Sequence, residues 1–239
     1  MDHNAGPDSP DPGTPDPGTP ASDTPANPTL DAPLAEAWIR ALAAAVDAHQ
    51  RELTDLDSAI GDGDHGSNLH RGFTAVLAVL DSPEDPPEPA DAGAVLGRTG
   101  RTLISKVGGA SGPLYGSAFR AMGAALPPSP ATPAEFAGAL AAGLAAVRQL
   151  GGAGPGDKTL VDAYAPALAA FEQAVAAGAG LARAAEAAAE AAEQGMRATT
   201  PLQARKGRAS YLGPRSIGHQ DPGATSTALL FRTLADVTG

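Results

Sequence analysis

The sequence predicts an all-α protein that is preceded by a tail without regular structure. After residue 33, the chain of 239 residues is dominated by Ala, Leu, Glu and Arg, which all favour helix. Apolar residues recur there at the spacing of one helix face, as at Phe73, Val76, Leu77 and Leu80. No segment alternates polar residues with the β-branched residues that are typical of strands. These three observations favour a helical domain without a sheet.

The domain organisation follows from a change in composition near residue 33. Residues 1–33 are rich in Pro, Asp and Gly and contain no Lys or Arg. Apolar residues are too scarce there for burial to offset the entropy of ordering the chain. We therefore expect a disordered tail over 1–33 and one helical domain over 34–239. A docking motif for a partner within the tail is the alternative to a plain tail.

Eight helical segments are expected in the domain. They span about 34–55, 67–81, 90–106, 113–126, 133–150, 158–176, 179–199 and 224–237. Glycine is concentrated between them, at 61–66, 108–116, 151–156 and 207–223. A helix bundle needs only short connections, so glycine-rich ones suggest that the backbone approaches a ligand closely.

Composition and charge exclude several classes of protein. The chain has no cysteine, which excludes disulfides, thiolate metal sites and a cysteine nucleophile. Its net charge is −11, whereas duplex nucleic acid requires a basic face. No apolar run is long enough to span a membrane, and the N-terminus lacks the pattern of a signal peptide. We expect a cytoplasmic protein with neither a nucleic-acid nor a membrane partner.

The loop at 56–68, LDSAIGDGDHGSN, contains three aspartates. Asp57 lies at the end of the first helix, and Asp62 and Asp64 lie on the same side of an extended stretch because side chains alternate. Three carboxylates with no Lys or Arg nearby in the sequence repel one another, and a hard divalent cation removes that repulsion. Oxygen-only ligands favour Mg²⁺ or Ca²⁺. The alternative is a polar turn in which an aspartate caps the next helix.

The type of cation can be narrowed from the same loop. An EF-hand that starts at Asp62 would need Asp or Asn at Gly66 and Glu at Phe73, so the loop does not fit. Mg²⁺ held by a few carboxylates keeps positions open for phosphate oxygens. The loop therefore predicts a nucleotide bound through magnesium.

The loop at 106–117, KVGGASGPLYGS, contains the second motif. Its glycines form a bend, and Pro113 suits the first turn of a helix. Free backbone N–H groups and the Ser111 hydroxyl can hold an anion there. Ser111 as a plain helix cap is an equally good interpretation.

The motif at 151–159, GGAGPGDKT, resembles a phosphate-binding P-loop but differs from it in two ways. Asp157 stands between the last glycine and Lys158, and the motif follows a helix rather than a strand. We therefore expect Asp157 to cap the next helix.

The stretch at 204–224 is the strongly basic part of the chain, with Arg205, Lys206, Arg208 and Arg215. In an acidic protein, a long basic loop between two helices predicts contact with an anionic ligand or partner.

Together, the four motifs resemble those of the dihydroxyacetone kinase L-subunit family, in the same order and over residues 34–239. The resemblance implies an antiparallel eight-helix barrel with a nucleotide site at one end. It implies that Asp57, Asp62 and Asp64 hold two Mg²⁺ ions between the phosphates of ADP or ATP. The residues implied around the nucleotide are His65, Ser67, Asn68, Ala110, Ser111, Gly151, Leu160, Arg208, Asp221, Pro222 and Gly223. No catalytic residue is assigned with certainty, and Arg208 is the candidate.

The resemblance also implies a function and partners. In this family the chain donates a phosphoryl group to dihydroxyacetone (glycerone), which is held on a separate K subunit. Some members use ATP, and others keep ADP bound and recharge it from a phosphohistidine M subunit of the phosphoenolpyruvate phosphotransferase system. We favour the second type, in which a free-standing L chain occurs. The alternatives are an ATP-dependent glycerone kinase subunit, the nucleotide domain of a fatty-acid kinase, and a non-catalytic nucleotide-sensing module.

Overall fold

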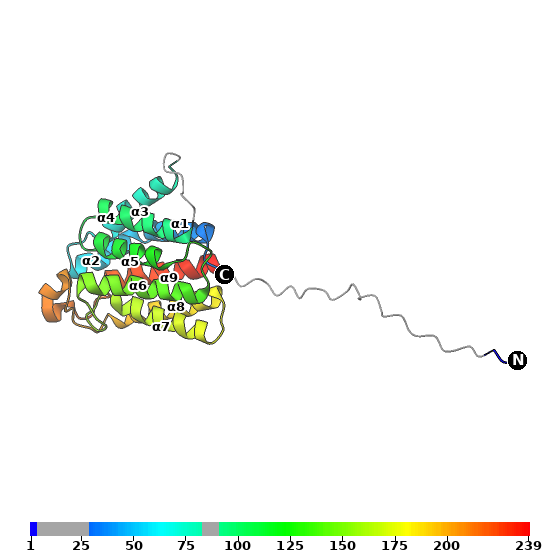
Figure 1. Cartoon of the computed structure of the whole chain (residues 1–239). Helices are drawn as coiled ribbons and strands as arrows, with labels where there is room; N and C mark the ends of the chain where they lie inside the picture. The colour runs from blue at the N-terminus through cyan, green and yellow to red at the C-terminus, as the bar shows by residue number, and fades with distance from the viewer. Residues whose placement is uncertain (4–28, 83–90) are drawn as a thin grey trace.

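The computed structural model describes residues 1–3, 29–82 and 91–239, and the regular structure in these ranges is helical (Figure 1). The helices are α1 (Ala32–Ala48), α2 (Gln50–Ile60), α3 (His65–Leu80), α4 (Ala92–Lys106), α5 (Ser111–Ala125), α6 (Pro133–Gly151), α7 (Val161–Ala176), α8 (Leu181–Ala198), the 3₁₀ helix η1 (Arg208–Ser216) and α9 (Pro222–Thr238). The all-α prediction is confirmed, because the described ranges contain no strand beyond an isolated bridge between Leu30 and Ala131. None of their helices is long and apolar enough to cross a membrane.

The packed domain begins before residue 34, where we had expected the tail to end. Leu30 is fully buried, and its backbone exchanges two hydrogen bonds with Ala131, at 2.9 and 2.8 Å. Asp31 caps α1 by accepting a hydrogen bond from the Leu34 N–H at 2.9 Å. The last residues of the predicted tail therefore belong to the domain. The rest of the predicted disordered tail, residues 4–28, lies outside the described residues.

The first predicted helix is in fact two helices. The segment expected at 34–55 is divided at His49, whose backbone (φ −102°, ψ 9°) departs from helical geometry, and α2 continues to Ile60. The division allows α1 to pack on α9 and α4 while α2 packs on α3. That last contact is close, because a Cβ atom on Gly66 would lie 2.1 Å from the Gln50 carbonyl oxygen. The other seven predicted segments each correspond to one helix.

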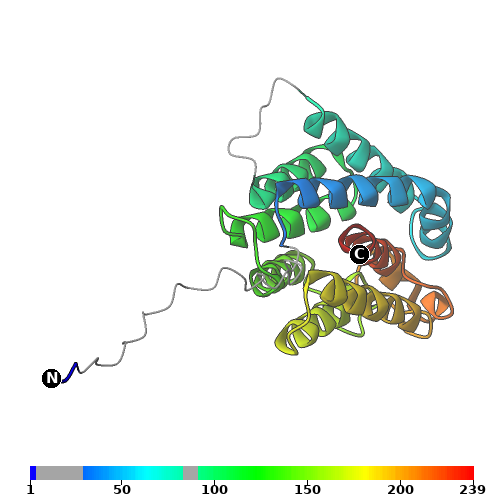
Figure 2. The same cartoon turned by 90° about the vertical axis from the view of Figure 1, so that its right-hand side faces the viewer.

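Successive helices from α3 to α9 pack side by side, and α1 packs against both α3 and α9, so the helices form a closed ring. In Figure 2, α9 lies between α1 and the α7–α8 pair. Neighbouring helices run in opposite directions, so α3, α5, α7 and α9 all begin at one end of the ring. The helix η1 lies at this end, opposite the C-terminus (Figure 1).

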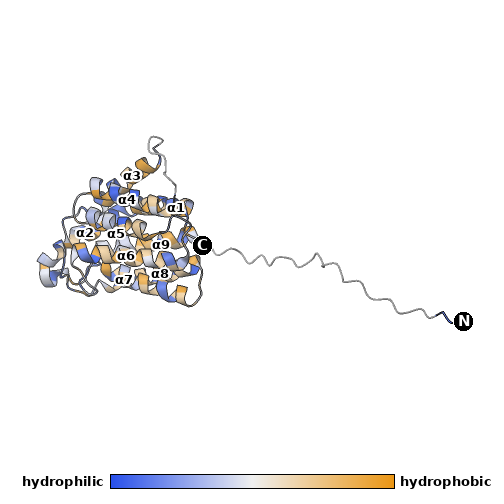
Figure 3. Ribbon diagram, in the orientation of Figure 1, coloured by the Kyte–Doolittle hydropathy of each residue, from blue (hydrophilic) through white to orange (hydrophobic). Residues whose placement is uncertain are grey.

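The body of the ring is held together by aromatic and small side chains, and apolar residues recur along its helices in Figure 3. Trp38 makes edge-to-face contacts with Phe119 and Phe136, at centroid distances of 5.9 and 5.8 Å. On α8, Ala184, Ala185, Ala188, Ala189 and Ala192 are all fully buried. These small side chains let α8 pack closely against α7 and α9.

Candidate functional site

A cavity of about 170 Å³ lies at the end of the ring where α3, α5, α7 and α9 begin. Three of the four glycine-rich connections that the sequence singled out, at 61–66, 108–116 and 207–223, contribute residues to its lining. Of the residues predicted for the site, the cavity is lined by Asp57, Asp62, Asp64, His65, Ala110, Ser111, Leu160, Arg208, Asp221, Pro222 and Gly223. The fold thus brings together motifs that are up to about 165 residues apart in the sequence.

Asp57, Asp62 and Asp64 form a carboxylate cluster at this cavity. Each contributes an oxygen atom, and these atoms lie within 4.8 Å of one another. Asp57 also folds the loop, because its Oδ2 accepts hydrogen bonds from the Asp64 and His65 backbone N–H groups at 2.8 and 3.2 Å. Gly61 is required for this turn, since a Cβ atom there would lie 2.1 Å from Asp57 Oδ1. The fold therefore holds three like charges together, an arrangement that a bound cation stabilises.

The alternative interpretation of this loop, an aspartate that caps the next helix, fits Asp57, which accepts hydrogen bonds from the first N–H groups of α3, but it does not fit Asp64. Asp64 occupies the N-cap position of α3, but its carboxylate accepts no capping hydrogen bond. The hydroxyl of Ser67 instead donates to the Asp64 carbonyl at 2.9 Å. The Asp64 carboxylate is therefore available to a cation.

The fold brings a basic residue to this loop from a distant part of the sequence. Arg208 of η1 lies beside Asp62, with Nε 2.8 Å from Oδ2. The Arg208 side chain is 68% exposed and that of Asp62 is 39% exposed, so the pair is open to solvent. Such an exposed pair contributes little stability and can rearrange.

Helix N-termini surround the cavity, since α3, α5, α7 and α9 all begin there. The N-cap of α5 is Ala110, not Ser111 as the capping interpretation required, and no side chain caps this end. At the start of α7, in contrast, the Val161 N–H donates to Thr159 Oγ1 at 3.2 Å. Since each helix N-terminus carries a partial positive charge, the cavity attracts an anion on the side that faces the carboxylates.

Asn68 provides a further donor behind the carboxylates. It is 4% exposed, and its Nδ2 has no hydrogen-bond partner among the described residues. Its Oδ1 accepts a hydrogen bond from Arg71, which fixes the orientation of the amide. Nδ2 faces the second glycine-rich loop, since a Cβ atom on Gly109 would lie 3.2 Å from it. A buried N–H without a partner is costly, so this group is suited to a ligand.

His65 is held by a buried network. Its Nε2 lies 2.9 Å from Ser226 Oγ. The Tyr115 hydroxyl lies 2.7 Å from the same Ser226 oxygen and 2.8 Å from Thr227 Oγ1. Burial lowers the pKa of His65 to about 4, although Asp57 and Asp64 act in the opposite direction. Burial raises the pKa of Tyr115 to about 12. His65 is therefore neutral at pH 7, in a fixed orientation at the cavity.

Asp221 and Lys158 bring two more charged groups to the same end. Asp221 is the N-cap of α9 and accepts a hydrogen bond from the Ala224 N–H at 2.7 Å. Burial raises the pKa of its carboxyl to about 7, which Ala224 and Lys158 partly oppose. Burial lowers the pKa of Lys158, whereas the charge of Asp221 raises it.

Three of the predicted residues do not line the cavity. Ser67 is exposed on α3, and Asn68 lies behind the wall. Gly151 is the last residue of α6, where a Cβ atom would lie 3.3 Å from the side chain of Leu114, which does line the cavity. Conversely, we had not assigned Tyr115, Lys158, Thr159 and Lys206, which line it. All four lie within the motifs already singled out, so the motifs were the available signal.

The predicted role of Asp157 as a helix cap is wrong. Helix α7 begins at Val161, and Asp157 Oδ2 instead accepts a hydrogen bond from the Gly154 N–H at 2.9 Å. Asp162, inside the helix, accepts hydrogen bonds from the backbone N–H groups of Gly156 and Thr159. The turn before α7 is therefore stabilised by two carboxylates, Asp157 within the turn and Asp162 in the helix that follows it.

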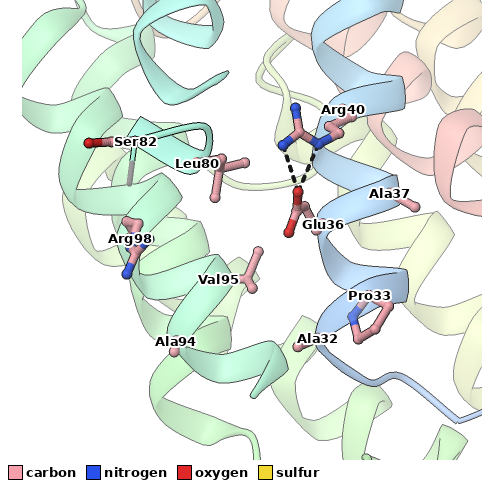
Figure 4. Close-up of a pocket in the computed structure, with 10 residues that line it drawn as sticks. All are labelled: Ala32, Pro33, Glu36, Ala37, Arg40, Leu80, Ser82, Ala94, Val95 and Arg98. Atoms are coloured by element: carbon pink, nitrogen blue, oxygen red, sulfur yellow. Dashed lines mark hydrogen bonds and ion pairs between the residues drawn. The ribbon is translucent and has the colours of Figure 1, made fainter. Parts of the chain in front are cut away.

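A second hollow of about 480 Å³ lies between α1, the end of α3 and the start of α4 (Figure 4). Most of its lining is apolar, including Ala32, Pro33 and Val95. Its charged residues include Arg40, which donates two hydrogen bonds to Glu36. It is larger than the cavity at the aspartates but lacks a carboxylate cluster, and the two helices that begin beside it, α1 and α4, are already capped by Asp31 and Asp91. The smaller cavity is therefore the candidate functional site.

The fold and the site together define a helical domain that combines a carboxylate cluster with anion-attracting helix N-termini. The model of the DAK2 domain family matches residues 59–236, and the chain belongs to this family. The resemblance to the dihydroxyacetone kinase L subunit is thereby confirmed.

Curated relatives agree with this assignment. The chain is 43% identical to the ADP-binding subunit DhaL of the PEP-dependent dihydroxyacetone kinase of Escherichia coli K12, over 83% of this chain and 93% of that protein. It is 38% identical to the corresponding PTS-dependent subunit of Lactococcus lactis, over 84% and 94% of the two chains. The triokinase/FMN cyclase of Rattus norvegicus is 35% identical over 79% of this chain but only 32% of its own length.

Solved structures show the same fold. The dihydroxyacetone kinase of C. freundii superposes with a TM-score of 0.65 at 26% identity and covers 95% of this chain. This chain spans 38% of that enzyme's length. A second structure of the same enzyme, similar to this chain at the same TM-score, is a complex with AMP-PNP and Mg²⁺.

Proposed function

We propose that this chain is the nucleotide-binding, phosphoryl-donor subunit of a dihydroxyacetone kinase of the phosphoenolpyruvate-dependent type. The observation that carries the proposal is the carboxylate cluster of Asp57, Asp62 and Asp64, at a cavity surrounded by helix N-termini. Carboxylates attract divalent cations, and helix N-termini attract phosphates. A magnesium nucleotide is the common ligand that satisfies both. The relatives named as ADP-binding subunits support the same conclusion.

The donor set fits magnesium. It consists of carboxylate oxygens alone, with neither Cys nor His among the clustered groups, and Mg²⁺ prefers oxygen ligands. We propose that Asp57, Asp62 and Asp64 hold two Mg²⁺ ions, because bound ADP or ATP adds further negative charge to the three carboxylates. When bound, such ions neutralise charge on the phosphates and fix their orientation.

The surrounding residues hold and orient the nucleotide in this proposal. The N–H groups at Ala110 and Ser111 and the Asn68 amide donate to phosphate oxygens, because these donors are unpaired or lie at an uncapped helix end. Arg208 leaves its ion pair with Asp62 and binds a phosphate, since that ion pair is exposed to solvent. The other residues proposed to contact the nucleotide are His65, Ser67, Gly151, Leu160, Asp221, Pro222 and Gly223.

The acceptor is proposed to lie on a partner. We expect this partner to be a K subunit that binds dihydroxyacetone. The present chain supplies the phosphoryl group to that dihydroxyacetone. A phosphohistidine M subunit then recharges the bound ADP. The two relatives described as PEP- or PTS-dependent favour this route over the use of free ATP.

The metal site is tested by calorimetry and thermal unfolding with ADP. ADP is expected to stabilise the wild-type protein only when Mg²⁺ is present, by about 2.7 kcal/mol at a hundredfold excess over Kd. Asp64→Asn is expected to abolish this stabilisation and to leave the apo protein folded, because the substitution relieves repulsion within the cluster. Asp157→Asn, at a turn outside the cluster, is the matched control and retains it. ADP binding to Asp64→Asn with wild-type affinity would show that the metal assignment is wrong.

The kinase function is tested with the cognate K subunit and dihydroxyacetone. Phosphoryl transfer is expected with phosphoenolpyruvate and the phosphotransferase proteins, and not with ATP alone. Transfer from ATP alone would identify the ATP-dependent type. Nucleotide binding without transfer from either donor would instead favour a nucleotide-sensing module.

A further inference from the structure

Lys158 has an unusual position at the base of the basic segment. It is 1% exposed, although lysine is rarely buried without partners. Its backbone φ is +62°, and it is the one non-glycine residue with a positive φ in the described part of the chain. A side chain in this region is strained and persists only where surrounding contacts fix it. The contacts of the Lys158 side chain therefore indicate its structural role.

All the donors of Lys158 are used by protein carbonyls. Its ammonium donates to the carbonyl oxygens of Thr199 at 2.9 Å, of Leu202 at 3.2 Å and of His219. An ammonium has three N–H donors, so none is left for a phosphate. Lys158 therefore lines the cavity without being able to bind an anion as the lysine of a P-loop does.

The three carbonyls come from the two ends of one segment. Thr199 and Leu202 lie where α8 ends, and His219 lies just before α9 begins. The segment between them carries η1 with Arg208, and it ends at Asp221, Pro222 and Gly223 in the cavity wall. Lys158 thus joins both ends of the 199–221 segment at one point.

Neighbouring hydrogen bonds depend on this junction. The Thr199 hydroxyl accepts a hydrogen bond from the Asp221 N–H at 3.0 Å, and the Thr200 carbonyl accepts one from the Gly218 N–H at 2.8 Å. On the other side, the Arg205 N–H donates to the Asp157 carbonyl at 3.0 Å. Without the ammonium, three carbonyls lose their partner, and that of Thr199 is buried, so opening of the segment to water becomes more favourable.

We propose that Lys158 is a positioning residue, which sets the nucleotide affinity of the site by fixing the 199–221 segment against the carboxylate cluster. This inference rests on the proposed nucleotide site. It assigns to Lys158 no contact with the nucleotide and no step in phosphoryl transfer.

The test uses Lys158→Met, which keeps the length of the side chain and removes its charge. MgADP affinity is measured by calorimetry, and hydrogen exchange is followed at the backbone amides of Arg205, Gly218 and Asp221. We expect at least tenfold weaker binding and faster exchange at these three amides, with exchange in α4 and α5 unchanged. Excess MgADP is expected to restore protection in the variant. Lys106→Met, which replaces an exposed lysine outside the cavity lining, is the matched control.

Two results would overturn the inference. MgADP binding within twofold of wild type would show that the junction does not set affinity, and weaker binding without faster exchange would make Lys158 a direct contact. If Lys158→Met does not fold, Thr199→Val removes the neighbouring acceptor of the Asp221 N–H, and wild-type binding and exchange in that variant would overturn the inference. Failure of the wild-type protein to bind MgADP would count against the proposed function instead.

Discussion

The body of the helical ring and its site end are stabilised in different ways. In the body, Trp38, Phe136 and Phe171 are fully buried, and Phe136 contacts the other two edge to face. At the site end, the buried groups include a carboxyl at Asp221 and an ammonium at Lys158. Apolar burial stabilises a fold without any ligand, whereas buried polar groups stabilise it only when each has a partner.

The difference shows where the molecule depends on a ligand. The carboxylates of Asp57, Asp62 and Asp64 and the Asn68 amide are held in place by the surrounding fold, but the fold does not fully satisfy them. The body can therefore be weakened without an effect on binding. The site end can be changed with little effect on the body.

The largest expected effect is that of Phe136→Ala in the body. Phe136 packs between Trp38 and Phe171, with ring centroids 5.8 and 5.6 Å away. Removal of a buried aromatic ring leaves a cavity and costs about 3–5 kcal/mol. Urea unfolding without ligand is expected to show this loss, whereas the MgADP affinity of the folded variant stays within twofold of wild type. A tenfold loss of affinity would show that body and site are coupled.

The next largest expected effect is a dependence of the free energy of unfolding on pH, which comes from Asp221 at the site end. Burial raises the pKa of Asp221 to about 7 from its ordinary value of 3.8, so the folded protein retains a proton that the unfolded chain has lost. The free energy of unfolding therefore falls as the pH rises from about 4 to about 7, by at most about 4 kcal/mol from this group. Above pH 7 the contribution is constant.

Asp221→Asn isolates this contribution. The amide oxygen can still accept the hydrogen bond from the Ala224 N–H but does not titrate. His65, whose pKa burial lowers to about 4, acts with the opposite sign and is present in both proteins. We expect the variant to gain stability relative to wild type as the pH rises from 4 to 8, measured by urea unfolding without Mg²⁺ or nucleotide. Parallel curves for the two proteins would contradict the raised pKa.

The same comparison explains what the sequence could predict. Helices of the body follow from the spacing of apolar residues, and the carboxylate cluster follows from three aspartates within eight residues. Both signals are local. The break at His49 is not local, because it depends on how α1 and α2 pack against different helices.

Hydrogen bonds and ion pairs between segments that are distant in the sequence could likewise not be predicted from residue spacing. Arg208 reaches Asp62 across 146 residues, and Lys158 binds carbonyls 41, 44 and 61 residues away. Asp157 was assigned as a cap by residue type alone, but Asp162 makes the hydrogen bonds that prepare the start of α7. Sequence spacing identified the loops of the site, whereas their internal hydrogen bonds required the fold.

A smaller effect distinguishes two arginines, Arg208 and Arg232, that differ in their distance from the site. Arg208→Ala is expected to weaken MgADP binding about tenfold, or about 1.4 kcal/mol, because Arg208 lies at the cavity. Arg232→Ala on α9 removes contacts with Glu186 and Glu193, at 2.8 Å each, and is expected to lower stability by about 0.2–1 kcal/mol without changing affinity. Calorimetry and thermal unfolding of both variants separate the two outcomes. Equal losses of affinity would refute a special role for η1.

The smallest expected effect is that of removing residues 1–28. This part of the chain is rich in Pro, Asp and Gly and has few apolar side chains to bury, so its removal is expected to change stability by less than about 0.5 kcal/mol. The sequence alone suggested that the deletion could extend to residue 30. Leu30, however, is fully buried and bonded to Ala131, so removing Thr29 and Leu30 as well is expected to cost about 2–3 kcal/mol. Thermal unfolding of the two truncated chains, with and without MgADP, measures the difference. If the shorter deletion lowers the melting temperature by several degrees, residues 1–28 contribute to the stability of the domain, and its boundary lies before Leu30.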